Sequence, residues 1–274
     1  MSVSSVVARP DIDAGFPRLL REWRHKRRLS QLDLALNSGV SQRHVSFLES
    51  GRANPSRSMI LQLSETLEVP LRDRNTWLTA AGFAPVFRSH ALDEPQMAQV
   101  MSAVRMMLAA HEPFPAIALD RAWNIRLSNG PFGRLGTMLG EDIWDRVGGG
   151  QPNLMRLFFH PDGIRPFVSN WSAVGPLMWR RAQREAEALG GREMQAVLDD
   201  LAPLQDAIVL GAPSEAALVP VMPFNLDIRG LKISMFAVVS TFGTAQDVTT
   251  DELRIETLFP ADADSEALFR NAAQ

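Results

Sequence analysis

Residues 30–56 read SQLDLALNSGVSQRHVSFLESGRANPS and decide the fold of the first third of the chain. Ser30 and Asp33 have the spacing of a capping box, in which a hydroxyl accepts from a backbone N–H three residues on while a carboxylate reaches back. This pattern predicts a helix that begins after Ser30 and ends near Asn37.

A second short helix is expected after a tight turn. Gly39 can adopt the positive φ that such a turn requires, and Ser41 is a second helix N-cap. The next helix is predicted over Gln42–Glu49, and its apolar side chains are expected to pack onto Leu32 and Leu36 of the first helix. Two short helices joined in this way form a helix–turn–helix, the geometry that places the second helix in the major groove of DNA.

The outer face of this second helix carries polar side chains suited to reading bases. Gln42, Arg43 and Ser46 are left on that face, and glutamine can pair bidentately with adenine and arginine with guanine. His44 either touches a phosphate or base or is simply exposed. The structural alternative is a plain helical hairpin with a solvated polar face.

The net charge of −3 hides an asymmetry between the two parts of the chain. Residues 1–90 contain 13 Lys and Arg against 8 Asp and Glu, a net charge of +5, and the remainder contains 15 against 23, a net charge of −8. A basic N-terminal third on a slightly acidic protein indicates an anionic partner for that third alone.

The rest of the chain divides into further predicted elements. Residues 14–84 read as a run of short helices, of which the last spans Arg72–Ala80, and residues 85–95 read as a linker. Downstream we expect helices at Gln96–Ala110, Pro131–Leu139, Pro166–Leu189 and Met194–Leu201, and strands within Ala116–Asn129 and at Leu218–Asp227, Leu231–Phe242 and Leu253–Phe259.

The quoted stretch resembles a known family of DNA-binding domains. Ser30–Ala35, Gly39–Ser41 and Val45–Ser56 closely resemble the XRE family of bacterial regulators, which is related to the lambda-type repressors. The resemblance covers about residues 14–84 and implies an all-α, five-helix, lambda-repressor-like domain. It also implies that Gln31, the first residue of the second helix, holds a phosphate of the DNA.

The same resemblance implies roles for other residues. The exposed start of the recognition helix reads bases, and there Phe47 either presses a thymine methyl group or simply packs. Arg52 and Asn54 match the loop that meets the DNA backbone. The expected DNA-binding residues are Gln31, Ser41, Gln42, Arg43, His44, Ser46, Phe47, Arg52 and Asn54.

Three downstream segments resemble a second family. Asp120–Asn124 with Asn129, the stretch Asn153–Trp171, and Gln246–Asp262 resemble the MmyB-like ligand-binding domain. The match covers about residues 105–265. It implies a PAS-like α+β fold, in which helices wrap around one face of an antiparallel sheet, and an apolar pocket for a fatty-acid-like ligand.

Large apolar side chains in this region are either core or pocket lining, and a core of this size needs such residues anyway. We expect a closed apolar pocket between the sheet and the Pro166–Leu189 helix, near Trp171. Arg180, Arg181 and Arg184 form a basic face of that helix, which is either solvated and ion-paired or clamps a ligand carboxylate. The predicted ligand-binding residues are Trp123, Phe158, Phe167, Trp171, Val174, Met178, Phe224 and Phe236.

Composition argues against several other classes of function. The chain has no cysteine, which excludes thiolate metal sites, disulfides and thiol nucleophiles. Its histidines are not paired at metal-ligand spacing, and Lys26 and Lys232 do not follow glycine as a Walker A loop requires. We therefore expect no enzyme activity, no metal and no cofactor. Because no apolar run could span a bilayer and Met1–Asp13 does not read as a signal peptide, we expect a cytoplasmic protein without membrane contact.

These observations predict a two-domain transcription regulator. We expect residues 1–90 to bind double-stranded operator DNA, and residues 91–274 to bind a small apolar ligand and to mediate dimerisation. A homodimer is expected because one recognition helix reads too few bases for genomic specificity. The alternative is a DNA-binding regulator whose C-terminal domain serves only dimerisation or the binding of a protein partner. An enzyme in that domain would have no sequence pattern behind it.

Overall fold

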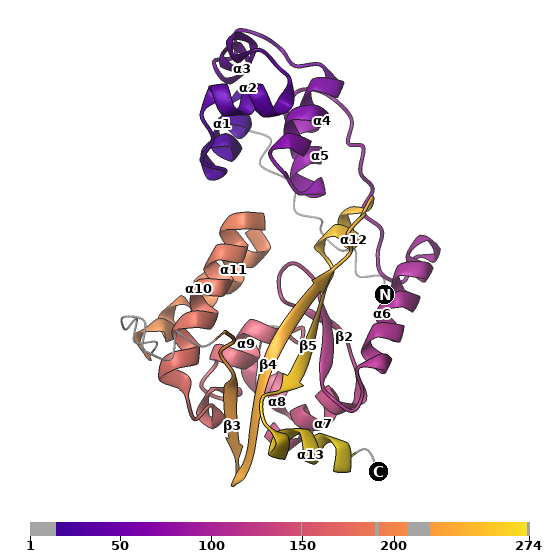
Figure 1. The fold of residues 1–274 in the computed structure, drawn as a ribbon, viewed down its shortest axis with the longest axis vertical. Coiled ribbons are helices and arrows are strands. Elements are labelled where there is room, and N and C mark those ends of the chain that lie inside the picture. Colours follow the sequence, from indigo (N-terminus) through magenta and orange to yellow (C-terminus); the bar gives the residue numbers. More distant parts are fainter. Residues whose placement is uncertain (1–14, 149, 190–191, 208–219, 273–274) are drawn as a thin grey trace. The chain divides into compact units, whose positions relative to one another are not determined.

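The structure, a computed structural model, describes residues 15–148, 150–189, 192–207 and 220–272 (Figure 1). The chain divides into two compact units. The first comprises the residues up to His90 together with Thr244–Asp251, and the second comprises Ala91–Gly243 together with the residues from Glu252 onward. The first unit therefore includes a short segment that lies far along the chain from its helices.

Helices make up the first unit, and their starts follow the predicted caps. Ser30 Oγ accepts from the N–H of Asp33 at 3.1 Å, and Asp33 Oδ2 accepts from the N–H of Ser30 at 2.9 Å, which confirms the capping box. Gly39 has a φ of 70°, and Ser41 caps the next helix. Within residues 15–90 the helices are α1 (Phe16–Lys26), α2 (Gln31–Ser38), α3 (Gln42–Glu49), α4 (Arg57–Thr66) and α5 (Leu71–Ala80).

The packing of α2 differs from the sequence expectation. Leu32 and Leu36 are 49% and 72% exposed, so they do not lie under α3. The buried residues of α2 are Leu34, Ala35 and Ser38, which share one helical face. Because α2 has leucine on two faces, its apolar pattern alone does not decide which face is buried.

The second unit is built on an antiparallel sheet. Within the described residues the strands are ordered β2-β1-β5-β4-β3 and each pairs antiparallel with its neighbour. The predicted fold class is confirmed in its outline: five N-terminal helices are followed by an α+β domain with an antiparallel sheet. Residues 218 and 219, the start of one predicted strand, lie outside the described residues. The strands are β1 (Ala116–Leu119), β2 (Ile125–Ser128), β3 (Phe224–Ile228), β4 (Leu231–Thr241) and β5 (Arg254–Pro260).

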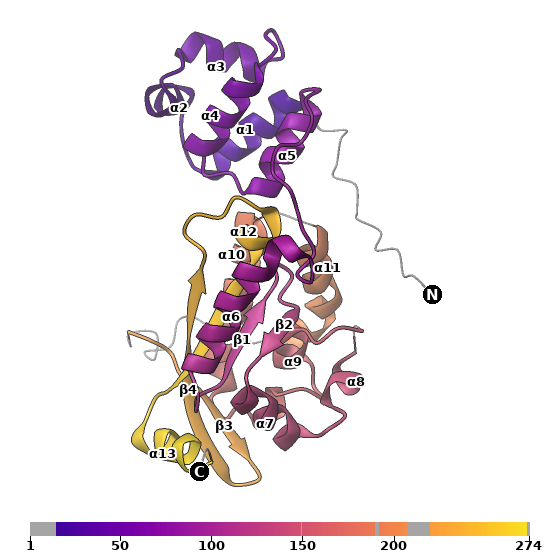
Figure 2. The same cartoon turned by 90° about the vertical axis from the view of Figure 1, so that its right-hand side faces the viewer.

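Helices pack on both faces of this sheet. Figure 2 shows α6 (Ala98–Ala110) lying across one face, where its Val104 and Leu108 pack with Ala118 and Ile255. The other face packs against a larger set of helical segments. The helical segments after α5, other than α6, are η1 (Pro95–Met97), α7 (Gly130–Leu139), α8 (Ile143–Val147), α9 (Leu154–Phe159), η2 (Arg165–Phe167), α10 (Trp171–Leu189), α11 (Arg192–Leu201), η3 (Ala202–Ala207), α12 (Val248–Glu252) and α13 (Ala263–Asn271).

Polar residues from the MmyB-like segments hold the turns of the second unit. Asp120 Oδ1 accepts from the N–H groups of Ala122 and Asn124 at 2.9 and 3.0 Å, which closes the turn between β1 and β2. Asn129 Oδ1 accepts from the N–H of Ala116 at 2.9 Å. These side chains bind backbone groups, so they shape the scaffold that carries the cavity described below.

Candidate functional site

The recognition helix α3 presents its first residues to solvent. Gln42 and Arg43 are exposed, and Ser46 and Phe47 are half-buried. The guanidinium carbon of Arg43 lies 5.3 Å from the centre of the Phe47 ring, a cation–π contact. Arg43 and Phe47, which lie one turn apart on α3, therefore form one continuous surface.

Other predicted DNA contacts flank α3 in the chain. Ser41 Oγ accepts from the N–H of His44 at 3.2 Å, so the hydroxyl caps the helix. Arg52 and Asn54 are exposed in the loop after α3, and His44 is half-buried. A capped helix start followed by a basic loop suits contact with the phosphate backbone, which positions a recognition helix on DNA.

Gln31, the predicted phosphate contact, is held from α3. Its Nε2 donates to Glu49 Oε2 at 2.8 Å. Arg24 of α1 binds the same carboxylate twice, from Nε to Oε1 at 2.6 Å and from Nη2 to Oε2 at 2.9 Å. One carboxylate thus joins α1, α2 and α3, and it orients the recognition helix.

The ion pair at this point is buried. Glu49 is 3% exposed and Arg24 is 7% exposed. Burial raises the pKa of Glu49, but hydrogen bonds from Arg24 and Gln31 and the charges of Arg24 and Arg21 outweigh it, so the pKa lies below its ordinary value. The carboxylate is therefore charged at neutral pH.

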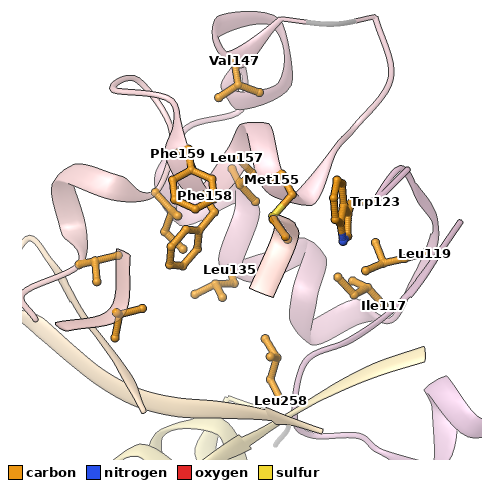
Figure 3. Close-up of a cluster of buried hydrophobic side chains, with 14 of the residues drawn as sticks. Ile117, Leu119, Trp123, Leu135, Val147, Met155, Leu157, Phe158, Phe159 and Leu258 are labelled. Carbon is orange, nitrogen blue, oxygen red and sulfur yellow. The ribbon is translucent and has the colours of Figure 1, made fainter. Parts of the chain in front are cut away.

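The second unit contains an apolar cavity of about 300 Å³. It lies between the sheet, which contributes Ala237 of β4 and Leu258 of β5, and α10, which contributes Leu177. Figure 3 shows Leu135, Phe158 and Leu258 among the side chains of this core. The apolar lining is formed by Ile117, Phe132, Leu135, Gly136, Leu139, Leu154, Leu157, Phe158, Ile164, Val174, Leu177, Met178, Val221, Met222, Phe224, Ala237 and Leu258.

Half of the predicted ligand-binding residues line this cavity. They are Phe158, Val174, Met178 and Phe224. Their contact with a ligand stays a prediction. Trp123 does not line the cavity, because its fully buried indole lies among other core side chains and its Nε1 donates to Glu185 Oε2 at 2.7 Å. Figure 3 shows its ring beside Leu119.

Strand alternation explains why Phe236 does not line the cavity. Met235 is buried toward the helices that cover the cavity, and successive strand residues face opposite sides of a sheet. Phe236 therefore lies on the other face, where it stacks on Phe259 with ring centres 5.7 Å apart.

Trp171 and Phe167 also lie outside the cavity lining. The ring of Trp171 packs against Phe158 and Phe159 with centre distances of 5.3 and 5.8 Å, so it supports a lining residue from behind. Phe167 in η2 is half-buried and packs against the core. The cavity therefore lies further along α10 than the predicted closed pocket near Trp171, and its lining residues Arg184 and Val221 are exposed.

Charged side chains line one part of the cavity, namely Arg181, Arg184 and Glu256. Arg181 binds Glu185 from Nε at 2.7 Å and also binds Glu256. Burial raises the pKa of Glu185, but the charges of Arg254 and Arg181 and its hydrogen bonds outweigh that effect, so the pKa lies below its ordinary value. Arg254 also binds Glu185, at 2.5 Å, so the network contains two arginines and two glutamates and its formal net charge is zero.

Sequence reasoning missed the glutamates and Arg254 in this network. One signal was available, because Arg254, Glu256 and Leu258 alternate along β5 and so share the face that lines the cavity. Charged residues on the buried face of a strand indicate partners in another element, here Glu185 and Arg181 of α10.

Two models of known families match the chain. Residues 100–272 match the model of the MmyB-like transcription regulator ligand binding domain, and residues 20–73 match a helix-turn-helix model. The chain belongs to the MmyB-like transcription regulator family. This regulator combines a DNA-binding helix–turn–helix of XRE type with a ligand-binding domain, as predicted, and both matched families are regulatory rather than enzymatic.

The chain was also compared with curated proteins and with solved structures. Curated proteins give no significant match. Among solved structures, an RNA-binding light-oxygen-voltage receptor is 14% identical with a TM-score of 0.27; the alignment covers 96% of this chain and 62% of that receptor chain.

Across the described residues, no helix has the length and hydrophobicity to cross a membrane, and no cluster of three or more histidine or acidic side chains could hold a metal ion.

Substitutions at the start of α3 test the DNA interface. We expect Arg43→Ala and Gln42→Ala each to weaken binding of a selected operator by about 1–3 kcal/mol and to relax base preference, because base-edge contacts carry the specificity. Gln31→Ala should weaken binding to all sequences about equally. Fluorescence anisotropy with selected and scrambled duplexes measures both effects. An Arg43→Ala variant with unchanged affinity and base preference would place the recognition surface elsewhere.

The buried carboxylate yields a stability prediction. We expect Glu49→Gln to destabilise the full chain by about 3 kcal/mol, because it leaves the charge of Arg24 buried without its counter-ion. The folded pKa of Glu49 is lowered, so its stabilisation is complete above the unfolded value of about 4.3 and is lost as the pH falls through the folded value. The variant should therefore show a shallower loss of stability below about pH 4.

The matched control for this substitution is Glu22→Gln. It breaks an exposed ion pair of 2.6 Å with Arg18, also on α1, and should cost less than about 0.5 kcal/mol. Urea denaturation followed by circular dichroism at several pH values compares the two variants. Equal losses of stability would show that the buried pair is not special.

Proposed function

We propose that this MmyB-like regulator binds double-stranded operator DNA as a cytoplasmic homodimer and changes its operator affinity when a fatty-acid-like amphiphile occupies the cavity. The observation that carries the proposal is the cavity of about 300 Å³ with apolar walls and a charged part. Ligand pockets typically have volumes of about 300–1,000 Å³ and combine apolar walls with a few polar groups. A single acyl chain with a polar head suits such a space.

The apolar wall supports binding of a chain-like molecule. Each buried methylene contributes about 0.8 kcal/mol, so a chain of moderate length gains several kcal/mol from the wall alone. Met178 and Met222 are among the lining residues, and methionine side chains adapt their shape to flexible ligands.

Arg184 is the candidate partner for an anionic head group. Arg181 already binds Glu185 and Glu256, so its charge is balanced within the protein. Arg184 lines the cavity, is exposed, and forms no ion pair with any acidic residue that the structure describes. A ligand carboxylate at Arg184 would gain a charge-assisted hydrogen bond without disturbing the neutral network.

The homodimer follows from how helix–turn–helix domains read DNA. A two-fold dimer presents two recognition helices to successive major grooves and doubles the number of bases read. We expect light scattering of the full chain with a selected operator duplex to give two chains for each duplex. One chain for each duplex at saturation would contradict the proposed dimer.

A comparison of two amphiphiles tests the head-group contact. We expect Arg184→Gln to weaken binding of dodecanoic acid about tenfold at neutral pH, because one hydrogen bond to a charged group is lost, and to leave dodecanol binding unchanged. Calorimetry or displacement of a fluorescent fatty-acid probe measures both affinities. Arg180→Gln is the matched control, since Arg180 precedes Arg181 on α10 but does not line the cavity.

The outcomes separate the alternatives. A wild-type chain that binds neither dodecanoic acid nor dodecanol would remove the proposed ligand and favour a domain that serves dimerisation or partner binding alone. Equal losses for the acid in both variants would show that Arg184 acts through general charge and not by direct contact.

A further inference from the structure

The segment between β4 and β5 belongs to the first unit, although both strands belong to the second. β4 ends at Thr241 and β5 begins at Arg254, and Thr244–Asp251 groups with the helices of the first unit. Most of α12 lies in this segment, which overlaps the MmyB-like stretch Gln246–Asp262. Neither base reading nor cavity lining explains its polar residues.

The segment is bonded to the chain at the end of the helical unit. Asp247 Oδ2 lies 2.7 Å from His90 Nδ1, and both side chains are largely buried. Thr249 Oγ1 donates to the carbonyl of His90 at 2.7 Å, and the N–H of Val248 donates to the carbonyl of Arg88 at 2.8 Å. We call these contacts of residues 247–249 with residues 88–90 the clasp.

The same segment completes the N-terminus of α5. This helix begins after Pro70, whose side chain cannot accept a hydrogen bond, so the N–H of Leu71 needs a partner from elsewhere. Asp251 Oδ2 accepts from that N–H at 3.1 Å. A carboxylate at this point also interacts favourably with the helix dipole. Part of the stability of α5 therefore depends on a residue 180 positions further along the chain.

Residues between α5 and the clasp form hydrogen bonds with α5. Asn75 of α5 donates from Nδ2 to the carbonyl of Phe87 at 2.7 Å, and its Oδ1 accepts from the N–H groups of Val86 and Phe87 at 3.0 Å. Residues 86–90, which lie in the predicted linker, are thus bonded to α5 at one end and to the clasp at the other. These hydrogen bonds connect the clasp to α5 through residues 86–90.

On its other side, the segment continues into strands that line the cavity. Ala237 of β4 and both Glu256 and Leu258 of β5 are lining residues. Glu252, the last residue of α12, accepts from Arg121 Nη1 at 3.3 Å. The segment is therefore covalently continuous with two strands that line the cavity.

We propose that the clasp transmits the state of the cavity to the DNA-binding unit, so that a ligand in the cavity changes operator affinity through residues 247–251. The proposal rests on the proposed function, since it concerns the regulation of that same cavity. In thermodynamic terms, the clasp carries the coupling free energy between the two binding sites, and such couplings typically change affinity about 5–150-fold.

A double-mutant cycle tests the clasp without any ligand. Ala237→Phe fills the cavity from β4, and Leu177→Trp fills it from α10, so each imitates an occupied cavity. Thr249→Val removes the hydroxyl that donates to the carbonyl of His90 and keeps the cap in which Asp247 Oδ1 accepts from the N–H of Thr249. Asp247→Ala removes that cap and the contact with His90 Nδ1, and leaves the hydroxyl of Thr249 in place. The operator Kd of the full chain is measured for the single and double variants, with a duplex selected from a random pool.

We expect cavity filling to change the operator Kd about fivefold or more when the clasp is intact, and less than about twofold when it is broken. Asp262→Ala is the matched control. Asp262 accepts from the N–H of Ser265 at 2.8 Å and caps α13, much as Asp247 accepts from Thr249 at the start of α12, but it makes no contact with residues 88–90. It should leave the effect of cavity filling unchanged.

Two results would overturn the proposal. One is an equal effect of cavity filling with the clasp intact and broken, and the other is no effect of cavity filling in either background. Calorimetry with dodecanoic acid on the same proteins separates this inference from the proposed function. A wild-type chain that binds no dodecanoic acid refutes the proposed ligand, whereas the cycle still decides whether the clasp couples the cavity to DNA.

Discussion

The buried ion pair between Arg24 and Glu49 is the constraint on which the DNA-binding unit depends. Charges removed from water are tolerated only when they meet each other and their remaining polar atoms find partners. Here Glu49 also accepts from Gln31, and Arg24 also donates to the carbonyl of Leu29. A bidentate guanidinium–carboxylate contact has a narrow geometry, so it specifies how α3 is rotated against α1 and α2. Because the pair lies at the end of α3, the first residues of that helix stay available to DNA.

The second unit also contains paired arginines and glutamates, which lie beside the cavity. Arg181 and Arg254 balance Glu185 and Glu256 beside the apolar cavity. An arginine without a paired glutamate there would attract anions, and a glutamate without a paired arginine would repel a carboxylate. Because the arginines and glutamates are paired, the network neither attracts anions nor repels them. Among the lining residues, Arg184 alone carries a charge outside this network, and its side chain is exposed.

Local rules predicted the parts of this fold that depend on neighbours in sequence. The cap at Ser30 and the turn at Gly39 each need only a few adjacent residues, so the helix–turn–helix could be located from sequence. The faces of elements could not, because they depend on what packs against them. Leucine on two faces of α2 left the exposed Leu36 indistinguishable from a buried residue. Alternation shows that Met235 and Phe236 face opposite sides of β4, but only the neighbouring helices decide which of the two faces the cavity.

Several polar residues in the segments that carry the MmyB-like resemblance bind the backbone, which explains why those residues indicate the family and not the ligand. Asp120, Asn129 and Asn153 hold turns through backbone hydrogen bonds, and Asp247 and Asp251 bind the segment between β4 and β5 to the helical unit. Such geometry accepts few substitutes, because a short side chain must reach a given N–H or C=O group. A cavity wall of apolar side chains accepts many, provided that its total volume is kept. A chain built in this way can change the shape of its ligand site while the turns, the clasp and the DNA-binding helices stay in place.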